Sequence, residues 1–174
     1  MRTLHRFALT AGAIGAATVL ALPGNAFAVS KLSQSQAAAQ LRAAGVTWSS
    51  SGRCTDRQNP TCTSFEQINQ ASVTGLKTLK SASGCALNVT GGTEVGHDRT
   101  FRYSHEKGYK VDIGTPNDCL KNYIERSFTR LAPRGTHPRY RSSAGNVYTW
   151  EKNKYHWDIT FCDGVAACTA EASR

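Results

Sequence analysis

Two segments of the chain alternate apolar and polar residues, as a β-strand with one buried face does. In segment 109–113 every second residue is apolar, and Asp112 lies between two of the apolar positions. Segment 156–161 repeats the pattern and leaves His156 and Asp158 on its polar side. Successive side chains of a strand point to opposite faces, so both segments present ionisable groups away from the core. If the two strands are neighbours in one sheet, these groups meet on the same face.

Two α-helices are expected in the first half of the chain. Ser33 is an N-cap before an alanine-rich segment that ends at Ala44. Thr63 and Glu66 have the spacing of a capping box and predict that a second helix begins there and ends at Gly84.

A third helix is expected to begin at 115–118, where proline follows a threonine cap, and to continue through Leu131 until Pro133 stops it. Segment 132–143, rich in Arg, Pro and Gly, predicts an exposed loop. The remaining strands are expected at 86–90 and 145–150. This order predicts an α+β fold with a small, mostly antiparallel sheet and flanking helices.

The first 28 residues have the features of a secretion signal. Arg2 and Arg6 precede an apolar run, and small residues at 26–28 form a cleavage site. The alternative, a membrane anchor, is disfavoured because glycines and a proline interrupt the run. We therefore expect a signal peptide at 1–28, a single domain at 29–174, and a secreted, extracellular protein that can associate with the cell wall.

The six cysteines predict a domain stapled by disulfides, because an even number in an exported chain is typical of a disulfide framework. Two pairs of cysteines bracket short segments and are expected to bond locally, so the two remaining cysteines are expected to bond to each other. The expected bridges are Cys54 to Cys62, Cys162 to Cys168 and Cys85 to Cys119. A cysteine-rich metal site is disfavoured because the chain has no C-x-x-C pair.

The chain is basic, with 21 Lys and Arg against 12 Asp and Glu. A positive exported protein is attracted to polyanions such as the cell wall, teichoic acids or nucleic acid. The charge alone does not choose among them, and a surface that only aids solubility fits equally well.

His105, Asp112 and His156 are the candidate metal ligands. His105 precedes a glycine turn at Gly108, and the other two lie on the polar faces of the two alternating strands. Three ligands with one open position are the arrangement of a catalytic zinc site.

Ser104, His105, Gly108 and Asp112 stand in this order in one short segment. They resemble the signature of the LAS zinc peptidases, which include D-alanyl-D-alanine carboxypeptidases, D,D-dipeptidases and peptidoglycan endolysins and are related in fold to hedgehog. His156, followed by tryptophan, is similar to the last ligand of that family. The resemblance implies one Zn²⁺ per chain, bound by His105, Asp112 and His156.

The chain departs from the family where the proton-transferring Glu stands, three residues before the last His. Asn153 occupies that place, and the nearest upstream carboxylate is Glu151. We expect Glu151 to be the catalytic base. The family's upstream substrate-binding Arg is also missing, and Arg99 or Arg102 could replace it.

Three further residues are assigned to the surroundings of the metal. Asp158 lies on the strand face of His156 and could orient an imidazole. Ser104 and His97 lie close to the first ligand in sequence and are placed in the cleft or behind the ligands.

The resulting function is a secreted zinc peptidase that hydrolyses D-Ala-containing stem peptides of peptidoglycan by metal-activated water. We expect a monomer that binds peptidoglycan or peptide, without specific nucleic-acid binding or stable membrane association. One alternative is a secreted nuclease that needs no metal. The other is a zinc-bearing but inactive cell-wall binding module. Asn153 is the reason to consider it, because it stands where the family has its proton-transferring Glu.

Overall fold

The computed structural model describes residues 29–114 and 118–174, so the expected signal peptide and the expected helix start at 115–117 lie outside it. The helices are α1 (Gln34–Ala43), α2 (Gln70–Ser83), α3 (Asp118–Ser127) and α4 (Ala166–Ala172). The strands are β1 (Lys31–Leu32), β2 (Thr47–Trp48), β3 (Ile68–Asn69), β4 (Asn88–Gly91), β5 (Lys110–Gly114), β6 (Thr129–Arg134), β7 (His137–Arg141), β8 (Val147–Glu151) and β9 (His156–Thr160).

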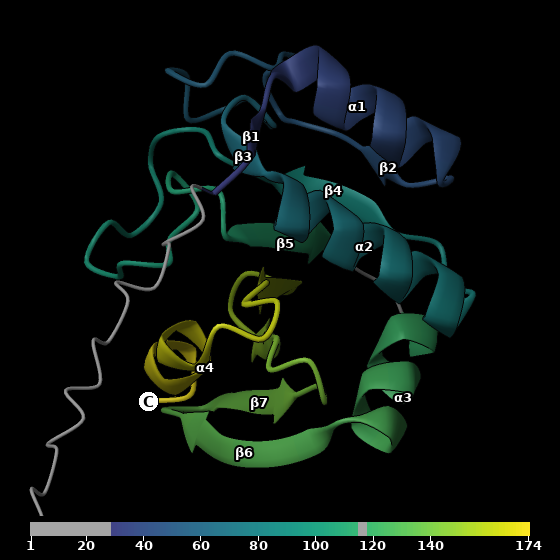
Figure 1. The fold of residues 1–174 in the computed structure, drawn as a ribbon, viewed down its shortest axis with the longest axis vertical. Helices are drawn as coiled ribbons and strands as arrows, with labels where there is room; N and C mark the ends of the chain where they lie inside the picture. Colours follow the sequence, from purple (N-terminus) through teal and green to yellow (C-terminus); the bar gives the residue numbers. More distant parts are fainter. Residues whose placement is uncertain (1–28, 115–117) are drawn as a thin grey trace, which may run out of the picture.

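One mixed sheet organises the described residues. Its seven strands have the order β2-β4-β5-β9-β8-β7-β6, and only β2 and β4 pair in parallel. A small second sheet joins β1 to β3 antiparallel. Helices α1 and α2 lie beside the β2–β4 end, and α3 and α4 lie near β6 and β7 (Figure 1). The expected α+β fold in a single domain is confirmed.

The core forms on one face of the central strands β5 and β9. Val111, Ile113, Trp157 and Ile159 are fully buried there, in one cluster with side chains of α1, α2 and α3 such as Leu76. The intervening residues of both strands point to the opposite face, as the alternating pattern predicts. The pairing of β5 with β9 is antiparallel, so the two polar faces form one surface.

Ser33 is the N-cap of α1, as predicted, and forms a capping box with Gln36. The Ser33 hydroxyl accepts from the Gln36 backbone N–H at 3.3 Å, and the Gln36 side chain accepts from the Ser33 backbone N–H at 3.0 Å. The two bonds satisfy donors that have no partner within the helix.

The predicted start of α2 is wrong, because the helix begins at Gln70. Thr63 donates its hydroxyl to the carbonyl oxygen of Ser49 at 2.8 Å, and Glu66 accepts from the backbone N–H of Gln34 at 2.7 Å. Gln67 has a φ of 65°, which is outside the helical region. The capping-box residues therefore tie neighbouring segments together instead of starting a helix.

The expected continuation of the third helix and the expected loop at 132–143 are both wrong. Helix α3 ends at Ser127, and β6 and β7 form an antiparallel hairpin there. Pro133 lies in β6, an edge strand, where its missing N–H removes no ladder bond. Arg139 of β7 is buried, because its guanidinium donates to the carbonyl oxygens of Ala132 and Ser173 at 2.9 and 3.0 Å.

The three predicted disulfides are confirmed: Cys54–Cys62, Cys85–Cys119 and Cys162–Cys168. The bridge between Cys85 and Cys119 connects the segment after α2 to α3. Three disulfides are typical of proteins that fold in an oxidising compartment. In the part of the chain that the structure describes, no helix has the length and apolarity needed to cross a membrane.

The long bridge should contribute most to stability. It spans 34 residues, against 6 for Cys162–Cys168, and the loop-entropy model assigns about 4 kcal/mol to the former and about 2 kcal/mol to the latter. The Cys85→Ser/Cys119→Ser variant should therefore lose more free energy of unfolding than Cys162→Ser/Cys168→Ser in urea titrations. Equal losses in the two double variants would contradict this ranking.

Candidate metal centre

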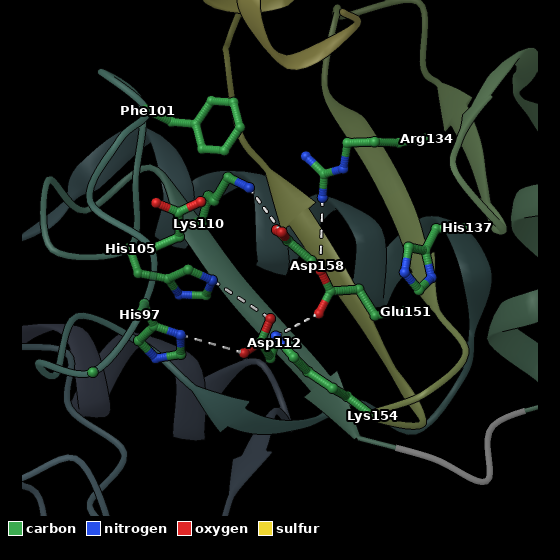
Figure 2. A pocket seen from close by; sticks show the side chains of 12 residues that line it. His97, Phe101, His105, Lys110, Asp112, Arg134, His137, Glu151, Lys154 and Asp158 are labelled. Carbon is green, nitrogen blue, oxygen red and sulfur yellow. Dashed lines mark hydrogen bonds and ion pairs between the residues drawn. The ribbon is translucent and has the colours of Figure 1, made fainter.

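The polar face of β5 and β9 forms the floor of a cleft of about 430 Å³ (Figure 2). Its walls come from the loop before β5 and from the hairpins β6–β7 and β8–β9. The lining residues are Gly96, His97, Asp98, Phe101, His105, Lys110, Asp112, Arg134, His137, Glu151, Lys154 and Asp158. Histidines, carboxylates and cations thus share one solvent-accessible space.

Asp112 is the centre around which the histidines gather. It lies on β5 opposite Asp158 of β9, and its neighbour two positions along, Gly114, lies opposite His156. On the other side β4 places Gly91 against Asp112. A Cβ at Gly91 would lie 2.4 Å from the Asp112 Oδ2, so glycine is required there for the carboxylate to fit.

His105 reaches Asp112 from the loop that precedes β5. The turn closes with a hydrogen bond from the Gly108 N–H to the His105 carbonyl oxygen, and Gly108 has a φ of 79°. The His105 Nδ1 lies 2.8 Å from the carbonyl oxygen of Gly92, so this nitrogen carries the proton. The Nε2, with its lone pair free, lies 3.5 Å from the Asp112 Oδ1. Burial lowers the pKa of His105, which favours the neutral imidazole that a metal needs.

His156 approaches the same carboxylate oxygen from β9. Its Nε2 lies 3.4 Å from the Asp112 Oδ1 and 3.1 Å from the Glu151 Oε2. Glu151 stands directly opposite His156 in the β8–β9 ladder. The structure therefore brings the three predicted ligands and the predicted base together.

His97, which the sequence pattern placed only in the cleft, is also close to Asp112. Its Nδ1 lies 3.9 Å from the Asp112 Oδ2, and its ring stacks on that of His105 with centroids 3.8 Å apart. Ligand atoms of His97, His105 and Asp112 all lie within 4.8 Å of one another. Only its position eight residues before His105 could have indicated this in the sequence.

The donor set fits a divalent metal. Two ligand atoms that each lie about 2.1 Å from a tetrahedral zinc are about 3.4 Å apart. The imidazole-to-carboxylate distances at Asp112 are 3.4, 3.5 and 3.9 Å, longer than the 2.7–3.2 Å typical of N–H···O hydrogen bonds. Imidazole and carboxylate are also ligands that zinc accepts. The group of His97, His105 and Asp112 could hold a metal ion.

Glu151 is held as an ionised carboxylate. Its Oε2 accepts from the Lys154 Nζ at 2.9 Å, and its Oε1 lies 3.6 Å from the Arg134 Nη2. The hydrogen bond with His156 contributes most to lowering the pKa of Glu151 well below its usual range, and Lys154 adds to the effect against the influence of burial.

We expected Asp158 to orient an imidazole, but it pairs with Lys110 instead. Its Oδ2 accepts from the Lys110 Nζ at 2.7 Å, and its Oδ1 is buried without a hydrogen-bond partner among the described residues. Burial would raise the pKa of Asp158, but the charge of Lys110 lowers it. Lys110 and Arg134 both lie over the ring of Phe101, at 5.6 and 5.8 Å.

The two arginines considered for substrate binding lie elsewhere. Arg99 forms an ion pair with Glu106, and Arg102 lies over the ring of Tyr103; neither lines the cleft. Ser104, adjacent to His105, is buried, and its carbonyl oxygen accepts from a backbone N–H that closes the turn.

The cations of the cleft are instead Lys110, Arg134 and Lys154, and His137 lies in its wall. The sequence reading missed Arg134 and His137 because both lie in the hairpin that it treated as an exposed loop.

Comparisons with known proteins add no relative. No model of a protein family matches the chain. No curated protein and no solved structure matches it either.

Removal of a central ligand should abolish metal binding. His105→Ala and Asp112→Ala should lose zinc during dialysis, because each removes a donor from a group that converges on one point. Elemental analysis of the purified proteins would measure this, with His137→Ala as the control, since His137 lines the cleft but does not contact Asp112. Full retention of zinc in both ligand variants would contradict the site.

Proposed function

We propose that this chain is an exported zinc peptidase that hydrolyses D-Ala-containing peptides of peptidoglycan. The observation that carries the proposal is the convergence of His105 and His156 on Asp112 with the carboxylate of Glu151 alongside, in an open cleft. The LAS resemblance supports it through the same residues. The disulfides support export.

In this proposal His105, Asp112 and His156 hold the zinc. When bound there, zinc polarises the scissile carbonyl and lowers the pKa of water toward 7. The chain contributes two neutral imidazoles and one negative carboxylate, which leave a net positive charge on the site. That charge favours an anionic transition state of peptide hydrolysis.

Glu151 is the proton acceptor in this proposal. It is the carboxylate that lies within hydrogen-bond distance of the proposed ligand His156. It ends β8 at the mouth of the hairpin, so its displacement from the family position, now Asn153, is compensated by the strand pairing that sets it opposite His156. A positioned carboxylate can then pass the proton to the leaving amine.

The other cleft residues suit a peptide substrate with a free carboxylate. Lys154 and Arg134 are both partly exposed at the wall and could pair with an anionic group of the substrate. Phe101 offers an apolar surface beside Arg134. The carboxylates Asp98, Asp112, Glu151 and Asp158 also line the cleft, which makes it a poor site for a polyphosphate chain and weighs against the nuclease alternative.

A zinc-bearing but inactive binding module is the second candidate. The observation that favours it is the hydrogen bonding of Glu151 to His156 and Lys154, which lowers the basicity of the carboxylate. A hydrolysis assay separates the two candidates. Both bind zinc, but only the peptidase hydrolyses peptides and requires Glu151.

Glu151→Gln should keep zinc but lose activity. Glutamine preserves the shape of the side chain and cannot accept the proton, so hydrolysis of isolated peptidoglycan should fall by about 10²–10⁴-fold, the usual contribution of a general base. Mass spectrometry of the released peptides and D-Ala would measure the rate.

Glu125→Gln, an exposed change on α3, is the matched control and should hydrolyse like the wild type. Wild-type activity in Glu151→Gln would refute the assignment of the base. Zinc-loaded wild type without any hydrolysis would favour the binding module.

A further inference from the structure

Glu94 is a buried carboxylate with no part in the proposed reaction. It is only 2% exposed and lies in the segment that follows β4. The Ser64 N–H donates to its Oε2 at 2.7 Å, and the Gly92 N–H donates to both oxygens at 3.0 and 3.1 Å. The His97 Nε2 lies 3.0 Å from its Oε1. A buried charge with this many partners has a defined position and orientation.

This carboxylate determines the tautomer of His97. Backbone N–H groups donate to both of its oxygens, so Glu94 is an acceptor only. The His97 Nε2 must therefore carry a proton. In the neutral imidazole the Nδ1 then presents its lone pair.

In the neutral form of His97 the Nδ1 lone pair faces Asp112. The Nδ1 lies 3.9 Å from the Asp112 Oδ2, a distance too long for a hydrogen bond, and the ring stacks on that of His105. Because the lone pair of an imidazole lies in the ring plane, His97 must turn out of this stack to bind the metal that His105 binds. Two acceptors that face each other across this gap are both satisfied by a cation between them.

We propose that Glu94 is a positioning residue that holds His97, through its Nδ1, as a fourth protein donor to the metal. The inference rests on the metal site of the proposed function and does not require hydrolysis. The ligand it takes is a divalent ion such as zinc or cobalt, which imidazole nitrogen binds well. Carboxylate-oriented imidazoles are a recurrent way to fix a metal ligand.

The exposure of the three histidine side chains indicates which of them an incoming group can displace from the metal. The side chain of His97 is 22% exposed, against 16% for His156 and 6% for His105. His97 also has the longest approach to Asp112. We therefore place it at the open side of the site, where an incoming group can displace it.

Glu94→Gln tests this role without removing His97. The backbone donors of Ser64 and Gly92 cannot become acceptors, so the amide oxygen of the glutamine should face Ser64 and its NH₂ should face the His97 Nε2. That arrangement forces the proton of His97 onto Nδ1, where it points at Asp112. The imidazole stays in place but loses its metal-binding lone pair.

Zinc affinity should fall by about 10–100-fold in Glu94→Gln and in His97→Ala, measured by competition with a chromophoric chelator. The ¹⁵N shifts of His97 in the metal-free protein, recorded at a pH high enough to keep the imidazole neutral, should show a proton on Nε2 in the wild type and on Nδ1 in Glu94→Gln. Glu106→Gln is the matched control, because it removes a carboxylate beside His105 that pairs with Arg99 and does not contact His97. It should keep the wild-type affinity.

Wild-type affinity in both Glu94→Gln and His97→Ala would overturn the inference. If Glu94→Gln does not fold, the visible spectrum of the cobalt form of His97→Ala decides, since an unchanged spectrum would exclude His97 from the donor set. A wild type that binds zinc in a Glu94-dependent way but hydrolyses nothing would remove the proposed peptidase and leave this inference standing.

Discussion

The pairing of β5 with β9 is the constraint on which the site depends. The ladder sets Asp112 opposite Asp158 and Gly114 opposite His156, so Asp112 and His156 are diagonal neighbours on one face. A shift of one residue would move the apolar positions of one strand into the cleft and its ligands into the core. The buried side chains on the opposite face, such as Trp157 and Ile159, therefore fix the register of the candidate metal centre as well as of the core.

The parts of this arrangement that local pattern determines were predictable from the sequence. The alternation of apolar and polar residues predicted which side chains of β5 and β9 face the core, and Ser33 predicted the start of α1. Spacing of the cysteines indicated the three bridges. The strand faces, the helix start and two of the bridges depend on residues that are close together in the chain, and the third bridge then follows by elimination.

The parts that depend on distant contacts were not predictable. The β6–β7 hairpin looks like a loop because it contains Pro133 and several arginines, but the position at the sheet edge tolerates the proline, and Arg139 is buried by carbonyl oxygens near the end of α4. Likewise the role of His97 depends on Glu94, whose orientation is set by the backbone of Ser64. No periodicity or motif indicates that the backbone of Ser64 orients a carboxylate 30 residues further along the chain.

The proximity of Glu151 to His156 connects the two halves of the proposed chemistry. The same His156 nitrogen, Nε2, lies 3.1 Å from the Glu151 Oε2 and 3.4 Å from the Asp112 Oδ1. A nitrogen that gives its lone pair to a metal has no proton to donate, so His156 cannot serve both as ligand and as donor to Glu151. Once His156 binds metal, its hydrogen bond to Glu151 is absent, and the Glu151 Oε2 keeps Lys154 as its partner. Metal binding thus frees a lone pair of Glu151 from His156, so the carboxylate can accept a proton in the cleft despite its position five residues before the histidine.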